Sequence, residues 1–80
     1  MESAVVVFNI VSRGYSEDIE VPLDITANDL IKALNTVYSL DIDISDIKKC
    51  YLKAERPIAL LRGGRTLAEF GIRSGSVIFI

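Results

Sequence analysis

The first part of the chain predicts two β-strands, one from a run rich in apolar residues and one from the alternation of apolar with polar residues. The first covers residues 4–12 and is rich in Val and Ile. The second covers residues 18–23, and the turn-forming run Arg13-Gly14-Tyr15-Ser16 separates the two. Pro22 has no N–H to donate to a neighbouring strand. It therefore indicates an edge strand or the end of a strand.

The spacing of apolar residues then changes to that of a helix, which we expect over residues 27–39. Thr26 precedes it as a suitable N-cap, and Asp29 places negative charge in the first turn. One side of this helix should be apolar and the other polar. The apolar side comprises Ala27, Leu30, Leu34 and Val37 with Ala33 beside them, and the polar side comprises Asn28, Lys32, Asn35 and Thr36.

The second half of the chain predicts three further strands. Residues 40–47 alternate but are dense in Asp, so we expect an irregular connection that buries some of its Ile residues. Residues 48–55 read as a third strand, residues 58–61 as a short fourth strand, and residues 77–80 as the last. A turn at Gly63-Gly64 and a turn or 3₁₀ segment at residues 66–72 connect the last two.

This order of elements is hairpin, helix, strand, short strand, strand. A helix that crosses one face of a sheet formed in this order gives an α+β layer pair of the β-grasp type. We expect a mixed sheet of four to five strands with one helix packed across one face. The 80 residues leave no room for a second core, so residues 1–80 should form a single domain.

Several classes of function have no residues to support them. The chain has no His and one Cys, so it offers no Cys/His zinc set, no Ser-His-Asp triad and no internal disulfide. Cys50 falls on the apolar face of the third strand, where a buried thiol is a better interpretation than a reactive one. Asp41, Asp43 and Asp46 lack the Gly and Glu of a calcium-binding loop, which favours a solvated connection over a cation site. We expect no enzyme activity, no cofactor and no metal.

The cellular location expected from the sequence is the cytoplasm. No apolar run approaches the roughly 18 residues of a membrane span. The N-terminal region has no basic segment, and its apolar run is too short for a secretory signal.

Charge is distributed unevenly along the chain. The 9 Lys+Arg and 11 Asp+Glu give a net charge of −2, but residues 1–47 carry −7 and residues 48–80 carry +5. Such a dipole can steer a partner, or it can be an ordinary solvated surface. An acidic chain without a basic run interleaved with aromatic residues does not indicate nucleic-acid binding.

The sheet face that points away from the helix is the candidate binding surface. In a β-grasp sheet the first and last strands are central neighbours, and the third strand lies beside the last. Several apolar side chains should then gather on this face, where alternating polar residues are usual. Either the face binds a protein or a second copy of the chain, or it reflects the preference of Val and Phe for strands. The predicted partner-binding residues are Val5, Val7, Lys49, Tyr51, Lys53, Val77 and Phe79.

The run Arg65-Thr66-Leu67-Ala68-Glu69-Phe70-Gly71-Ile72 and the alternating strand that follows it resemble ubiquitin, with Phe70 where related folds often carry Tyr. The length near 80, the segment at residues 18–22 and the helix end at residues 39–42 resemble the YukD/EsaB group, ubiquitin-like proteins encoded with bacterial type VII (ESX-like) secretion systems. The resemblance implies a cytoplasmic accessory or regulatory component that contacts secretion machinery non-covalently, peripheral to its membrane complex.

Two alternatives remain open beside this interpretation. The run Leu61-Arg62-Gly63-Gly64 is similar to the conjugation tail of ubiquitin, but residues 65–80 follow it, so a tight turn is the better interpretation. A ubiquitin-like carrier or modifier is therefore disfavoured. A regulatory ubiquitin-like domain of a larger assembly is the other alternative.

Overall fold

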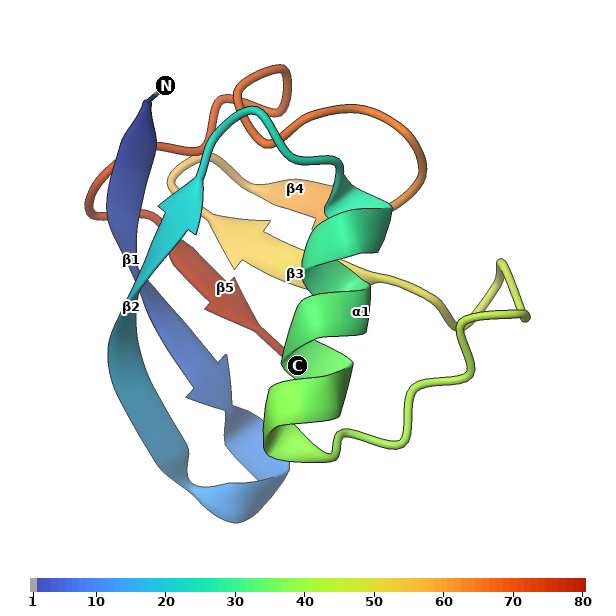
Figure 1. The fold of residues 1–80 in the computed structure, drawn as a ribbon. Coiled ribbons are helices and arrows are strands. Elements are labelled where there is room, and N and C mark those ends of the chain that lie inside the picture. The colour runs from blue at the N-terminus through green and yellow to red at the C-terminus, as the bar shows by residue number, and fades with distance from the viewer. Residues whose placement is uncertain (1) are drawn as a thin grey trace.

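Strands β1 (Ser3–Ile10) and β2 (Tyr15–Pro22) form an antiparallel hairpin in the computed structural model, which describes residues 2–80 (Figure 1). A short 3₁₀ helix, η1 (Val11–Arg13), connects them and ends at Gly14, whose φ is 60°. The hairpin is confirmed, but β1 ends two residues before the predicted limit and β2 begins three residues before it. The tight 3₁₀ turn explains both differences, since it uses few residues and allows pairing to reach Tyr15 opposite Ile10.

The helix α1 (Ala27–Tyr38) follows the hairpin and matches the prediction to within one residue. The Thr26 side chain caps it by accepting a hydrogen bond from the Asp29 N–H at 3.1 Å. It ends at Ser39, which adopts the left-handed conformation with φ 53°.

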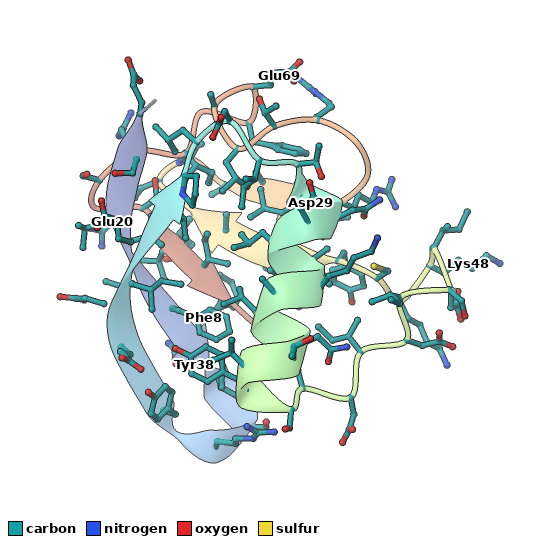
Figure 2. The ribbon with its side chains drawn as sticks, viewed as in Figure 1. Phe8, Glu20, Asp29, Tyr38, Lys48 and Glu69 are labelled. Atoms are coloured by element: carbon teal, nitrogen blue, oxygen red, sulfur yellow. The ribbon has the colours of Figure 1, made fainter. Side chains whose placement is uncertain are left out.

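The predicted apolar side of the helix is partly wrong. Val37 is 72% exposed and Ala33 is also exposed, whereas Ile31 is completely buried. Tyr38 also packs against the core, with its ring centroid 5.0 Å from that of Phe8 (Figure 2). The set 27, 30, 31, 34 and 38 has the same three- and four-residue spacing as the predicted set, so spacing alone did not distinguish them.

Three more strands complete a five-stranded mixed sheet among residues 2–80. They are β3 (Leu52–Glu55), β4 (Ala59–Leu61) and β5 (Val77–Phe79). The strand order is β2-β1-β5-β3-β4, and β1 and β5 pair in parallel while the other neighbours are antiparallel. The predicted central pairing of the first and last strands is confirmed, and so is the edge position of the strand that contains Pro22. The α+β architecture of β-grasp type is therefore confirmed.

The third strand is shorter than predicted, because its first four residues belong to a turn and its exit. The N–H groups of Lys49 and Cys50 both donate to the Asp46 carbonyl, at 3.0 and 2.9 Å. The Asp46 carboxylate also accepts from the Lys48 N–H at 3.0 Å. These bonds close a turn that the alternating sequence did not reveal, and β3 begins only at Leu52.

The core lies between the sheet and α1. Alternate residues of β1, β3 and β5 point toward the helix and are almost completely buried, among them Phe8, Leu52 and Ile78. Within residues 40–47, Leu40 and Ile42 pack against this core. The largest fully buried side chains are Phe8, Ile31, Leu52, Leu61, Leu67, Ile78 and Val6.

The connection between β4 and β5 contains a turn that is held by polar side chains. The Glu69 carboxylate accepts hydrogen bonds from the Thr66 N–H at 3.0 Å and the Thr66 hydroxyl at 3.1 Å. The Thr66 oxygen in turn accepts from the Glu69 N–H at 3.2 Å. The two bonds that the Glu69 carboxylate accepts lower its pKa, led by the one from the Thr66 N–H. The predicted turn at residues 66–72 is confirmed, and Phe70 packs against the core.

Candidate functional site

The outer face of the sheet brings the predicted apolar residues together. Val7 pairs with Val77 across the parallel β1–β5 ladder, and Phe79 pairs with Lys53 across β5 and β3. Val5 is 50% exposed, and Val7, Val77 and Phe79 are half-buried. The register thus places these side chains on the face opposite α1, at the centre of the sheet. This arrangement follows from alternation along each strand together with the strand order.

Four of the seven predicted residues line one shallow hollow on this face. It has a volume of about 240 Å³, and its walls include the half-buried rings of Tyr51 and Phe79. Lys49 and Tyr51 reach it from the segment before β3 rather than from strand positions, which corrects the predicted geometry. The lining residues are Lys48, Lys49, Tyr51, Lys53, Phe79 and Ile80.

The apolar surface extends further than the sequence analysis predicted. Ile58 is 91% exposed and Leu60 is 42% exposed. Both line a second hollow of about 520 Å³ beside Phe79. The run Ala59-Leu60-Leu61 does not alternate, so its facing could not be assigned from sequence. Its register can be read from the structure, where Leu60 lies opposite Lys53.

Charged side chains of opposite sign flank this apolar centre. On β2, Glu20 pairs with Val5 and Asp18 pairs with Val7, so carboxylates border one side. On the other side lie Lys49 and Lys53, together with one carboxylate, that of Glu55 opposite Val77. The uneven charge seen along the sequence therefore becomes a gradient across one surface, which favours one orientation of a bound partner.

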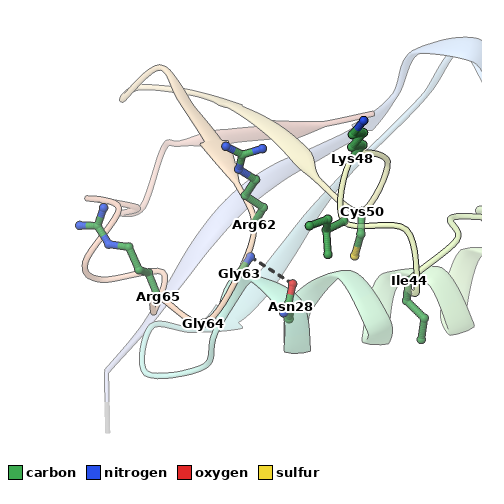
Figure 3. Close-up of a pocket in the computed structure, with 9 residues that line it drawn as sticks. Asn28, Ile44, Lys48, Cys50, Arg62, Gly63, Gly64 and Arg65 are labelled. Atoms are coloured by element: carbon green, nitrogen blue, oxygen red, sulfur yellow. Dashed lines mark hydrogen bonds between the residues drawn. The ribbon is translucent and has the colours of Figure 1, made fainter.

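A third hollow lies beside the helix, between the first turn of α1 and two loops (Figure 3). It has a volume of about 540 Å³. One wall is formed by residues 44–50 and the other by residues 62–65. We call it the helix-side groove. It is lined by Asn28, Ile44, Ile47, Lys48, Cys50, Arg62, Gly63, Gly64 and Arg65.

The Gly63-Gly64 pair lies in a turn, as predicted. Gly63 has a φ of 78°, which favours glycine, while Gly64 has no positive φ. The Gly63 N–H donates to the Asn28 side chain at 3.1 Å, and the Asn28 N–H donates to the Gly63 carbonyl at 3.1 Å (Figure 3). The chain then continues into β5 at the centre of the sheet. The pair is thus a structural connection between β4 and the helix N-terminus.

Acidic residues in the loop between α1 and β3 support the turns of that loop. The Asp43 carboxylate accepts hydrogen bonds from the Ser45 hydroxyl at 2.6 Å and the Ser45 N–H at 3.0 Å, which lower its pKa. Cys50 is buried, as predicted. Within residues 2–80, no three His, Cys, Asp or Glu side chains gather in a way that could hold a metal ion. No helix in the described part of the chain is both long and apolar enough to cross a membrane.

Solved structures with the same architecture are ubiquitin-like domains. The C-terminal ubiquitin-like domain of mouse tubulin-specific chaperone e matches with a TM-score of 0.75 and 10% identity, covering 98% of this chain and 84% of that one. A ubiquitin-like domain of tubulin-binding cofactor B matches at 0.74 and 18%, covering 98% and 87%. The ubiquitin-like domain of Plasmodium falciparum Dsk2 matches at 0.63 and 19%, covering 98% and 97%. At these identities the shared property is the fold.

The sequence itself matches a family model over almost its whole length. A comparison with curated proteins found no significant match. The model described as "WXG100 protein secretion system (Wss), protein YukD" matches residues 5–80. That span includes all five strands except the first residues of β1, as well as the outer face and the helix-side groove. The chain therefore belongs to the YukD family of ubiquitin-like proteins.

Proposed function

We propose that this chain is a non-catalytic protein-interaction module of a type VII (WXG100) secretion system, acting in the cytoplasm by non-covalent contact with the machinery. Family membership supplies the context. The observation that carries the proposal is the outer sheet face, where apolar side chains of β1 and β5 lie between acidic and basic flanks. Contiguous exposed apolar surface of this kind is typical of protein interfaces.

The binding residues we propose are those predicted from the sequence: Val5, Val7, Lys49, Tyr51, Lys53, Val77 and Phe79. Tyr51 and Phe79 are the expected anchors, because aromatic side chains in hollows contribute most to interface energies. The lysines beside them favour a partner whose contacting surface is acidic on that side. Ile58 and Leu60 extend the same surface toward the β4 edge.

Binding to purified soluble domains of the cognate secretion machinery tests this proposal. We expect Tyr51→Thr with Phe79→Thr to weaken the affinity at least about tenfold, since each truncates an aromatic anchor, and Thr suits the strand position of residue 79. The matched control is Val37→Thr, a change at an exposed helix position on the other side of the molecule. Circular dichroism should show that all variants keep the fold. Unchanged binding by the folded double variant would remove the outer face from the interface.

The competing use of this face is contact with a second copy of the chain. Light scattering over a concentration series distinguishes the two. We expect a monomer, in which the face is free for a secretion component. A dimer that dissociates when Phe79 becomes Thr would assign the face to self-association instead.

A further inference from the structure

We infer that the helix-side groove is a second docking site, which takes an extended acidic segment of a partner protein that carries an apolar anchor side chain. This goes beyond the proposed function, because the groove lies beside α1 and the proposed interface lies on the outer sheet face. Lys48 lines both the groove and the outer-face hollow, whereas Ile47 and Arg62 line the groove and not that hollow.

The charge of the groove is the first observation. Its lining carries three cationic side chains and no carboxylate, in a chain whose net charge is −2. The Arg65 guanidinium lies over the Phe70 ring, 5.2 Å from its centroid, and Figure 3 shows it pointing away from Cys50. Lys48 and Arg62 are therefore the two lining cations that we expect to contact a bound segment.

The carboxylates of the neighbouring loop do not line the groove. Asp43 directs its carboxylate to Ser45, and Asp46 directs its carboxylate to the Lys48 N–H. Neither belongs to the groove lining. An acidic partner segment would thus meet cations first, which raises association rates at low ionic strength.

The apolar wall is the second observation. Ile47 is 81% exposed and Ile44 is 47% exposed, and both line the groove together with the buried Cys50. Two exposed Ile side chains within one concave surface are a place for an apolar anchor rather than for a solvated loop. An apolar side chain of the partner, such as Leu, is the expected contact for this wall.

The third observation is that both walls are already held in place by two asparagines of α1. Asn28 exchanges hydrogen bonds with Gly63 on one wall. Asn35, two helical turns later, donates to the Ile42 carbonyl at 3.1 Å and accepts from the Ile42 N–H at 3.0 Å, just before the other wall. Apart from adjacent residues of the chain, no atom lies within 4 Å of a methyl group placed on Gly63 or Gly64, so the rim beside them is open. A preformed groove lowers the ordering cost of binding.

The occupant is a peptide carboxylate segment rather than a phosphate group, because the N–H groups of the helix N-terminus are already used. The Ala27 N–H donates to the Arg65 carbonyl at 2.9 Å, and the Asn28 N–H donates to Gly63. The Asp29 N–H donates to the Thr26 side chain. None of these three backbone N–H groups remains free to cradle a phosphate. Side-chain cations beside exposed Ile suit Asp or Glu residues next to an apolar residue.

Nuclear magnetic resonance with the ¹⁵N-labelled full chain tests the inference. The probe is the synthetic peptide EDELDES, and its matched control is QNQLNQS, which keeps the Leu and removes the negative charge. We expect saturable shifts of the Asn28, Lys48, Arg62 and Gly63 amides with the acidic peptide. Neutralising the peptide should weaken binding at least about fivefold, and added salt should weaken it as well.

Two variants then test the groove itself. Arg62→Glu and Ile47→Ser should each weaken binding of the acidic peptide roughly three- to tenfold, and both change exposed side chains, so the fold should persist. Arg73→Glu, an equal charge reversal at an exposed position outside the groove, should change it less than about twofold.

Three results would overturn the inference. They are equal binding of both peptides, shifts confined to Tyr51 and Phe79, and the same groove shifts produced by concentrating the protein alone, which would assign the groove to a second copy. Phe79→Thr should leave peptide binding intact. Failure at the groove is therefore distinguishable from failure of the outer-face proposal.

Discussion

Asn35 joins α1 to the segment that follows it, and its replacement by Ala is the sharpest test of how that segment is held. The side chain exchanges two hydrogen bonds with the Ile42 backbone, at 3.1 and 3.0 Å. Ile42 packs against the core at this point. Asn35→Ala removes both bonds and leaves a part-buried N–H and carbonyl of Ile42 without their partner.

The expected loss follows from opposing contributions. Each hydrogen bond contributes about 1 kcal/mol net, so removing two costs about 2 kcal/mol. Ala is a better helix former than Asn by roughly 0.6 kcal/mol, which offsets part of this cost. The net fall in the free energy of unfolding should be about 1.5 kcal/mol. For a chain of this size that corresponds to a decrease in Tm of roughly 6–12 °C.

Urea unfolding and native-state hydrogen exchange measure the effect globally and locally. The Ile42 amide should lose protection together with the fall in stability. Asn35→Asp keeps the acceptor oxygen and loses the donor, so it should show an intermediate loss. Val37→Ala is the control on the same helix, and it should stay within about 0.5 kcal/mol because Val37 is exposed. A loss for Asn35→Ala no larger than that control, with Ile42 still protected, would refute this account.

Three further predictions concern the turns and the titrating groups. Gly63→Ala should destabilise the protein by roughly 1–2 kcal/mol in urea unfolding, because φ is 78° there, whereas Gly64→Ala should have little effect; equal effects would contradict the role of φ. The hydrogen bonds to Glu69 hold its pKa below the ordinary value of 4.5, so its stabilisation is present above pH 4.5 and is lost as pH falls through the folded pKa. Unfolding measured from pH 6 to pH 2 should show this loss, and Glu69→Gln should reduce it. The hydrogen bond to Glu17 raises the pKa of Tyr15 from 10.0 to about 12, so its stabilisation is present below pH 10 and is lost as pH rises through the folded pKa. Ultraviolet titration of the phenol should shift back toward pH 10 in Glu17→Gln, and an unchanged curve would argue against this cause.

The sequence predicted those features that local patterns determine. Alternation and the Thr26 cap located the hairpin and the start of the helix, and the order of elements then implied the sheet topology. The outer-face residues followed, because facing along a strand is fixed once the buried side is known. In this way the gathering of Val5, Val7, Val77 and Phe79 on one face was predicted, whereas the register that places Val7 opposite Val77 was not.

Features that depend on distant contacts could not be predicted in this way. Two apolar sets share the helical spacing of α1, and the choice between Val37 and Ile31 depends on where the sheet lies. The sequence predicts Asn35 on the polar, solvent-exposed side of the helix, but the residue is half-buried and bonded to Ile42. The identity of a polar side chain does not indicate which backbone group it will bond. The helix-side groove is formed by segments far apart in the sequence, so no single motif indicated it.

The parallel pairing of β1 with β5 has a mechanical consequence. A pull that separates residue 3 from residue 79 drags two parallel neighbours lengthwise past one another, since it draws β1 from its beginning and β5 from its end. The bonds from Val7 to Ser76, from Ile80 to Asn9 and from Val11 to Ile80, at 2.9–3.0 Å, would then bear tension together rather than one after another. Separating the two strands requires these hydrogen bonds to break at the same time. In the antiparallel hairpin of β1 and β2 the bonds would instead break one by one from the open end. The molecule should resist stretching between these two points far better than it resists traction on β2.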